Sequence, residues 1–165
     1  MGLRRANGTN LMNILALDQA SKTGWALYQD GEISSGVIPL VIVPKSKGPG
    51  HRLVWFQREI DEMFGSFPRG ELAVYHEQPF TTDRIAADVI VCGLSMHIDS
   101  WCEQRGYRSR VVHNQTVKKY ATGSGRATKE QMLRNARIKW PDQVIIDHNQ
   151  ADALWILDFA IYGEK

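Results

Sequence analysis

The chain has 165 residues, of which 43% are hydrophobic and 23% charged, and its formal net charge is +2. This length and composition suit one compact domain over residues 1–165, with residues 1–11 expected to be flexible, and they exclude a disordered protein. No apolar run approaches the roughly 20 residues of a membrane span, and residues 1–11 resemble no secretion signal. We therefore expect no membrane association and a cytoplasmic location, in a bacterial or phage-infected cell or in an organelle matrix.

Three short strands are predicted at the start of the fold. Residues 12–18 form an apolar run that ends in an acid, and residues 23–29 alternate between apolar and polar side chains. Asp30-Gly31 is a strong hairpin signal, after which residues 32–38 form the third strand. The chain therefore begins with a three-stranded meander.

Helices and two further strands are predicted in the remainder of the chain. The spacing of apolar residues and a Thr128–Gln131 capping box indicate these elements, and either Asp147 or Asn149 can cap the last helix. In order, they are a helix over 51–66, a strand over 72–77, a helix over 83–104, a strand over 108–113, a short helix over 115–121, a helix from Thr128 and a last helix to about Tyr162. This order predicts an α/β fold in which a mixed five-stranded sheet carries helices on both faces.

Acidic residues end two of these strands. Asp18 closes the first strand and Glu77 the fourth, while Asp152 lies in the first turns of the last helix. Unpaired carboxylates are costly to bury, and several together repel one another unless a cation neutralises them. Hard oxygen ligands suit Mg²⁺ or Mn²⁺. Two such ions, bridged by Asp18, would support phosphodiester hydrolysis.

His148 is a further candidate for this site. It lies four residues before Asp152, so both side chains would project from the same face of the helix. It could be a metal ligand or a general acid/base, or it could only cap the helix or lie on the surface. Each acid taken alone is more commonly a cap or a salt-bridge partner. The hypothesis therefore depends on the three acids together.

Basic residues concentrate in one part of the chain. Residues 105–139 hold ten of the 20 Lys and Arg residues and a single acid, Glu130. Such a density is typical of a phosphate-binding surface, with a solvated basic helix as the alternative. The two cysteines, Cys92 and Cys102, form no CxxC pair, so neither a zinc site nor a disulfide is predicted.

Four segments resemble the RuvC-like Holliday junction resolvases, which belong to the RNase H-like (retroviral integrase-like) nucleases. LALDQASKTGWAL (15–27) is similar to their first strand and hairpin, and YHEQPF (75–80) to their second acidic motif. VVHNQTVKKYATGSGRATKEQM (111–132) resembles their stretch with a Val-Lys pair, a Gly loop and a later lysine, and DHNQADALWI (147–156) resembles their closing helix. The four segments follow one another in the family's order.

The resemblance implies an RNase H-like fold and a homodimer that nicks two strands of a four-way DNA junction symmetrically with Mg²⁺. It carries over Asp18, Glu77 and Asp152 as catalytic acids. It also carries over Lys118 and Lys129 as lysines that contact the DNA backbone or lie in the active site. The neighbouring basic residues expected on the same DNA surface are Lys119 and Arg126.

The resemblance bears on three further features. Phe80 corresponds to an aromatic residue that stacks on a base at the crossover, with packing in the core as the alternative. Many family members have a fourth acid where this chain has Asn149, so His148 or Asp147 would complete the ligand set, and we favour His148. The helix over 83–104 would form the dimer interface, or would simply cover the sheet.

Other functions fit parts of the same pattern. An RNase H-like nuclease acting on RNA or an RNA–DNA hybrid would use the same acids, so only substrate assays separate it from a resolvase. A nucleotide-binding kinase-like protein shares the strand order, but it needs two such domains, and the sequence has no GxxxxGK[ST] motif. A non-catalytic binder of branched DNA would not need the three acids. The sequence identifies neither a helicase partner nor a preferred cleavage sequence.

Overall fold

The computed structural model describes residues 12–39, 48–79 and 85–163 of the chain. Segment 1–11 and Phe80, for which the sequence gives rise to predictions, lie outside these ranges. Within the described ranges, every helix is too short or too polar to cross a lipid bilayer.

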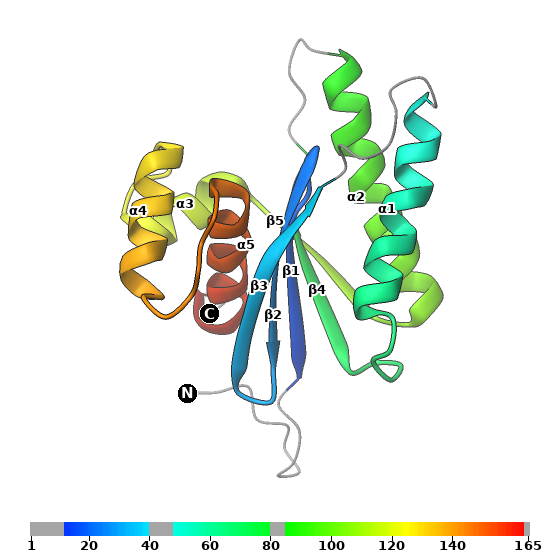
Figure 1. Cartoon of the computed structure of the whole chain (residues 1–165), viewed down its shortest axis with the longest axis horizontal. Coiled ribbons are helices and arrows are strands. Elements are labelled where there is room, and N and C mark those ends of the chain that lie inside the picture. Colours follow the sequence, from blue (N-terminus) through cyan, green and yellow to red (C-terminus); the bar gives the residue numbers. More distant parts are fainter. Residues whose placement is uncertain (1–11, 40–47, 80–84, 164–165) are drawn as a thin grey trace.

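Five strands form one mixed sheet in the order β3-β2-β1-β4-β5 (Figure 1). β1 pairs antiparallel with β2, and β2 with β3, whereas β4 lies parallel to both β1 and β5. The strands are β1 (Asn13–Asp18), β2 (Lys22–Gln29), β3 (Glu32–Pro39), β4 (Leu72–Glu77) and β5 (Arg108–Val112). The predicted α/β fold, a mixed five-stranded sheet that begins with a meander, is confirmed.

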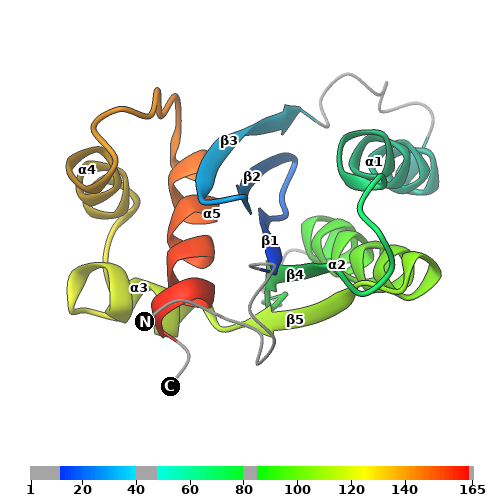
Figure 2. The same cartoon turned by 90° about the horizontal axis from the view of Figure 1, so that it is seen from below.

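Helices cover both faces of the sheet and give the molecule three layers (Figures 1 and 2). α1 and α2 lie on one face, and α3, α4 and α5 lie on the other. The helices are α1 (Gly48–Phe64), α2 (Ile85–Arg105), α3 (Asn114–Thr122), α4 (Lys129–Lys139) and α5 (His148–Asp158), which continues into a π-helical turn (Phe159–Gly163). Each helix that the sequence predicts is present.

The central strands are buried on both faces, because helices cover the sheet on each side. Along β1, Ile14 and Ala16 pack into the core beneath α5, whereas Leu15 and Leu17 pack into the core beneath α1 and α2. Successive side chains of a strand point to opposite faces, so this alternation fixes which face each later residue meets. Asp18 therefore continues the row that faces α5.

Two local features place the start of α5 against the sheet. Asp147 is the N-cap, since its Oδ1 accepts a hydrogen bond of 3.1 Å from the main-chain N–H of Gln150. Of the two cap candidates, the structure thus selects Asp147. Gly24 lies opposite Asp18 in the β1–β2 pair, and a Cβ at Gly24 would overlap with the main-chain carbonyl of Asn149. The absence of a side chain at this position lets the first turn of α5 contact β2, next to the end of β1.

Candidate active site

The ends of β1 and β4 bring two carboxylates to one face of the sheet. In the parallel pair, Leu17 lies beside His76, so Asp18 and Glu77 are the next residues along the two strands. On β4, Ala73 and Tyr75 pack into the core beneath α5, and Glu77 continues that row. Both acids therefore face α5 at the C-terminal ends of adjacent strands.

The first two turns of α5 supply the other two predicted residues. His148 and Asp152 lie four residues apart and line the same pocket as Asp18 and Glu77. This acidic pocket has a volume of about 250 Å³. Its lining residues are Asp18, Gln19, Ala20, Glu77, Gln78, Val91, Asn114, Lys129, His148, Asn149 and Asp152. Residues from β1, β4 and α5 thus line one pocket.

Mutual repulsion and burial act on the carboxylates of this pocket. Burial, together with the Asp152 and Glu77 carboxylates, raises the pKa of Asp18 well above its usual value, and Lys129 partly offsets this rise. Burial and then Glu77 raise the pKa of Asp152 to about 7, although Lys118 and Lys129 act in the opposite direction. The arrangement therefore favours a bound proton or another positive charge among the acids.

One carboxylate oxygen of the pocket lacks a partner. The Oδ1 of Asp152 is buried and makes no hydrogen bond within the described part of the chain. Asp158, on the same helix, contrasts with it, since its Oδ2 accepts hydrogen bonds from the Tyr120 hydroxyl and the Lys139 ammonium. Buried polar atoms are normally paired, so the orphaned oxygen of Asp152 marks a position where a ligand could bind.

The chemistry of the donor set fits a hard divalent cation, because the pocket presents three carboxylates, one of them with an unpaired oxygen. The spacing of these carboxylates, however, is not that of a preformed metal site. Among the described residues, no group of three or more His, Cys, Asp or Glu side chains is already arranged to hold a metal ion. The carboxylates would have to draw together around a cation, whose positive charge would offset the burial and repulsion that raise the pKa of Asp18 and of Asp152.

His148 makes a contact with a lysine within the pocket. The Lys129 ammonium lies 3.3 Å from His148 Nε2. A lysine ammonium can only donate, so in a hydrogen bond between the two groups Nε2 would be the acceptor. Asp147, the other candidate for a fourth ligand, caps α5 and does not line the acidic pocket. The geometry therefore favours His148 over Asp147.

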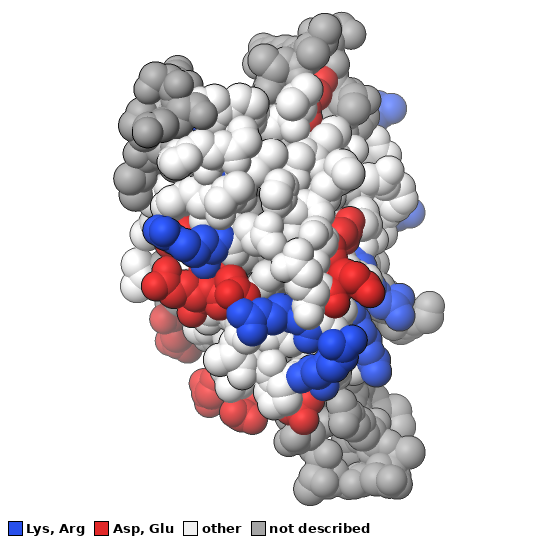
Figure 3. Space-filling model, turned by 90° about the vertical axis from the view of Figure 1, so that its right-hand side faces the viewer, with Lys and Arg blue, Asp and Glu red and all other residues white. Residues whose placement is uncertain are grey.

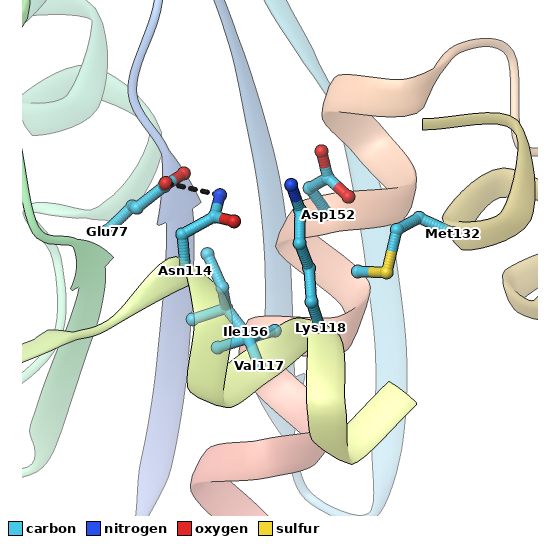
Figure 4. A pocket seen from close by; sticks show the side chains of 7 residues that line it. All are labelled: Glu77, Asn114, Val117, Lys118, Met132, Asp152 and Ile156. Atoms are coloured by element: carbon cyan, nitrogen blue, oxygen red, sulfur yellow. Dashed lines mark hydrogen bonds between the residues drawn. The ribbon is translucent and has the colours of Figure 1, made fainter. Parts of the chain in front are cut away.

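Two carboxamides that the sequence analysis did not single out hold Glu77 in place. The buried side chain of Gln19 donates to the main-chain carbonyl of Glu77 and accepts from its N–H at 3.1 Å. It thus extends the β1–β4 ladder by one step with a side chain. Asn114, the first residue of α3, donates to Glu77 Oε1 at 2.5 Å (Figure 4). The only sequence signal for either residue was its place directly after a strand.

The predicted DNA-binding residues divide into two groups. Lys129 lines the acidic pocket, and Lys118 extends from α3 toward Asp152 (Figure 4). Lys118 also lines a small niche with Glu77, Asn114 and Asp152. Lys119 and Arg126 are exposed and line neither space. The structure therefore brings two of the four basic residues to the acids and leaves the other two on the surface.

Comparison with known proteins identifies the fold. No protein-family model and no curated protein sequence matches the chain. Among solved structures, RuvC of Thermus thermophilus is 18% identical, with a TM-score of 0.67 over 90% of this chain and 95% of that one. T. thermophilus RuvC in complex with a Holliday junction substrate matches with a TM-score of 0.69 over 92% of this chain and 94% of that one, also at 18% identity.

These matches place the chain in a structural class, the α/β proteins with the RNase H-like fold. Within that class its fold is RuvC-like, which confirms the resemblance seen in the sequence motifs.

Proposed function

We propose that this chain is a metal-dependent endonuclease that resolves four-way DNA junctions by hydrolysing one phosphodiester bond in each of two strands. One observation carries the proposal: Asp18, Glu77 and Asp152 meet in a single pocket of a RuvC-like fold. Carboxylates gathered at the ends of core strands serve no evident structural purpose, since they repel one another there.

The proposed ligands of the divalent ions, two Mg²⁺ or Mn²⁺ per site, are Asp18, Glu77, Asp152 and His148. When bound, such ions polarise the phosphate and make a water molecule more acidic. Asp18 is the most deeply buried of the acids, with 8% of its surface exposed, which suits a ligand shared by two ions. Gln19 and Asn114 fix the main chain and the carboxylate of Glu77, so this ligand is oriented before any ion binds.

Lysines and the imidazole have separate roles in this proposal. The ammonium groups of Lys118 and Lys129 lie beside the acids and would hold the substrate's phosphates by charge. His148 Nε2 lies 3.3 Å from the Lys129 ammonium, and His148 would act either as a metal ligand or, in its place, as a general acid/base beside Asp152. Lys119 and Arg126, both exposed, would contact the DNA backbone beyond the pocket. Phe80 remains a predicted stacking residue.

The proposed active form is a homodimer, because symmetric cleavage requires two sites. The layer formed by α1 and α2 offers a surface for a second copy. Val54, Val89 and Met96 are exposed on these helices, at 65%, 54% and 71%. Charged side chains gather on the lower half of this face, and most of its upper half is uncharged (Figure 3). Light scattering of the purified chain should give the mass of a dimer.

A cleavage assay on a labelled synthetic four-way junction with Mg²⁺ tests the proposed function. We expect paired nicks on opposing strands and no cutting in EDTA. Asp18→Asn should be inactive, whereas Asp142→Asn, the same substitution at an exposed loop residue, should cut normally. If linear duplex DNA is cut as fast as the junction, junction resolution is refuted. Preferential cutting of an RNA–DNA hybrid would instead favour an RNase H-like nuclease that acts on such hybrids. A junction that is bound but never cut would instead indicate a non-catalytic binder.

A further inference from the structure

A series of side-chain hydrogen bonds ties the first turn of α5 to β3, the edge strand of the sheet (Figure 2). Gln150 Nε2 donates to Ser35 Oγ at 2.9 Å, and the Ser35 hydroxyl donates to Gln143 Oε1 at 3.1 Å. Gln143 Nε2 in turn donates to the main-chain carbonyl of Ile33 at 2.9 Å. We call Gln150, Ser35 and Gln143 the polar bridge. Each side chain donates to the next, so the bridge runs without a gap from α5 to the edge strand.

Gln150 is the most enclosed member of the polar bridge, with 3% of its surface exposed. Its Nε2 also donates to the main-chain carbonyl of Val144 at 3.1 Å, and its Oε1 accepts from the N–H of Ile146 at 2.9 Å. Both ends of the carboxamide are therefore engaged, which fixes the orientation of the group. A buried polar network whose members are all paired specifies one arrangement of the elements that it joins. Here those elements are β3, the segment before α5, and α5 itself.

The polar bridge holds α5 from the side that faces away from the acidic pocket. Successive residues of a helix are rotated by about 100°, so Gln150, two residues from both His148 and Asp152, projects to the opposite side. None of the three bridge residues is among those that line the acidic pocket. The bridge can therefore act on the carboxylates only through the position of α5.

The rotation of α5 about its axis decides where its side chains point. The apolar contacts of Ala151, Leu154 and other core residues hold the helix against the sheet, but such contacts have no preferred direction. Hydrogen bonds depend on angle as well as distance, so the bridge restricts rotation as apolar packing does not. A rotation of about 10° would move a carboxylate that lies about 6 Å from the helix axis by about 1 Å. Mg²⁺ requires its oxygen ligands at closely defined distances, so a displacement of that size would weaken ion binding.

We infer that Gln150 is a positioning residue of the candidate active site. Through Ser35 and Gln143 it sets the rotation of α5 that aims His148 and Asp152 at the ends of β1 and β4. The inference rests on the proposed function and adds residues outside the pocket on which ion binding depends. Because the bridge holds α5, the carboxylates converge on an ion by turning their side chains. β3, which contributes no residue to the described lining of the pocket, thereby supports the site.

Titration of the metal-free chain with Mn²⁺, followed by calorimetry, tests the inference without DNA. Gln150→Met keeps the length of the side chain and removes its hydrogen bonds, so Mn²⁺ affinity should fall about tenfold, as for other residues that orient metal ligands. Ser35→Ala breaks the bridge at a half-buried position and should act in the same direction. Ser35→Thr keeps the hydroxyl and should restore the affinity to within about twofold of wild type. Circular dichroism selects a temperature at which every variant is folded.

A matched control separates positioning from a general loss of stability. Tyr107→Phe removes a hydroxyl that donates to the main-chain carbonyl of Phe67 at 2.9 Å, within the core beneath α1 and α2. It should lower stability but leave Mn²⁺ affinity unchanged. If Tyr107→Phe weakens Mn²⁺ binding as much as Gln150→Met does, the inference is overturned. Mn²⁺ affinity that stays at the wild-type value in both Gln150→Met and Ser35→Ala would overturn it as well.

Cleavage kinetics distinguish this inference from the proposed function. At one fixed concentration of Mg²⁺, Gln150→Met should lower kcat, whereas KM for the junction should stay within about twofold, because the exposed DNA contacts are unchanged. If the wild-type chain cuts junctions while Gln150→Met and Ser35→Ala keep its kcat and Mn²⁺ affinity, the function stands and the inference fails. If the wild-type chain binds Mn²⁺ but cuts no junction, the nuclease proposal fails, and lower Mn²⁺ affinity in the two variants would still support the positioning role.

Discussion

His76 and Glu77 are neighbours on β4, yet the two faces of the sheet treat their side chains in opposite ways. His76 points to the α1 and α2 face, is fully buried, and contacts Asp99 at 3.1 Å, Ser109 at 3.2 Å and Ser95 at 3.4 Å. Glu77 points to the α5 face and joins two other acids whose pKa values are raised. A buried polar group whose hydrogen bonds are satisfied helps to stabilise the fold. Groups that repel one another reduce the stability of the folded chain, so their presence indicates a role in binding or catalysis.

The largest effect is expected when a carboxylate is removed from the acidic pocket on the α5 face. Asp18→Asn removes the central carboxylate and should lower junction cleavage at least a thousandfold, which is about 4 kcal/mol in the barrier. The same variant should raise the free energy of unfolding in EDTA at pH 7, because a repelled, buried charge is removed. Cleavage assays and urea unfolding measure the two effects. A variant that is less stable as well as inactive would show that Asp18 has a structural role.

Substitution of His76, on the α1 and α2 face, should reduce stability and have little effect on cleavage. His76→Ala leaves a cavity and removes the partner of Asp99 and Ser109, so the free energy of unfolding should fall by about 2–4 kcal/mol. Cleavage per folded molecule should change by less than threefold at a temperature where the variant is folded. Urea denaturation followed by circular dichroism gives the first quantity. A large loss of activity without loss of stability would mean that the two faces are not functionally distinct.

Gln19 links the two strands that carry Asp18 and Glu77, because its side chain bonds the main chain of Glu77 to the end of β1. Gln19→Leu keeps the size of the side chain and removes both hydrogen bonds. Affinity for Mn²⁺, measured by calorimetry, should fall about 10–100-fold, as for other residues that orient metal ligands. Gln29→Leu, at an exposed strand end, is the control. Unchanged Mn²⁺ affinity in Gln19→Leu would mean that the strand ladder alone fixes Glu77.

Some residues of the candidate site could be predicted from the sequence, and others could not. The positions of Asp18 and Glu77 followed from apolar runs that end in acids, and the fold followed from the order of these runs. Gln19 and Asn114 could not be found in that way, because their roles come from pairing between residues distant in sequence. The same applies to Gly24, which lies within the segment 15–27. Its necessity becomes evident only where α5 contacts β2.

A smaller effect is expected in the pH dependence of stability, to which Asp152 on the α5 face and His76 on the opposite face should contribute with opposite signs. The folded-state pKa of Asp152 is raised to about 7, so the folded chain binds a proton more tightly than the unfolded chain does. Without metal, this group should add stability as the pH falls from about 7 toward 4, by at most about 1.4 kcal/mol per pH unit. Asp152→Asn should remove the part of the slope that Asp152 contributes, and the double variant with Asp18→Asn should remove more of it. Saturating Mg²⁺ should also reduce it, because the ion replaces the proton.

His76 should contribute a slope of the opposite sign. Burial lowers its folded-state pKa below the usual 6.5, so protonation favours the unfolded chain as the pH falls below about 6.5. In a background that carries both Asp18→Asn and Asp152→Asn, metal-free stability should therefore decline on acidification, and His76→Ala should flatten that decline. The same slope in chains with and without His76 would assign the acid sensitivity to another group.

The smallest expected effect concerns the exposed surface beyond the pocket. Lys119→Ala removes one cation that is proposed to contact a DNA phosphate. Junction affinity should fall only a few-fold, and the slope of log affinity against log salt should fall by about one, because one fewer counterion is released. Arg69→Ala, an exposed cation in the loop before β4, should leave the slope unchanged, since that loop lies at the opposite end of the sheet from the acids. Equal slopes for wild type and Lys119→Ala would remove Lys119 from the DNA surface and restrict the phosphate contacts to Lys118 and Lys129 within the site.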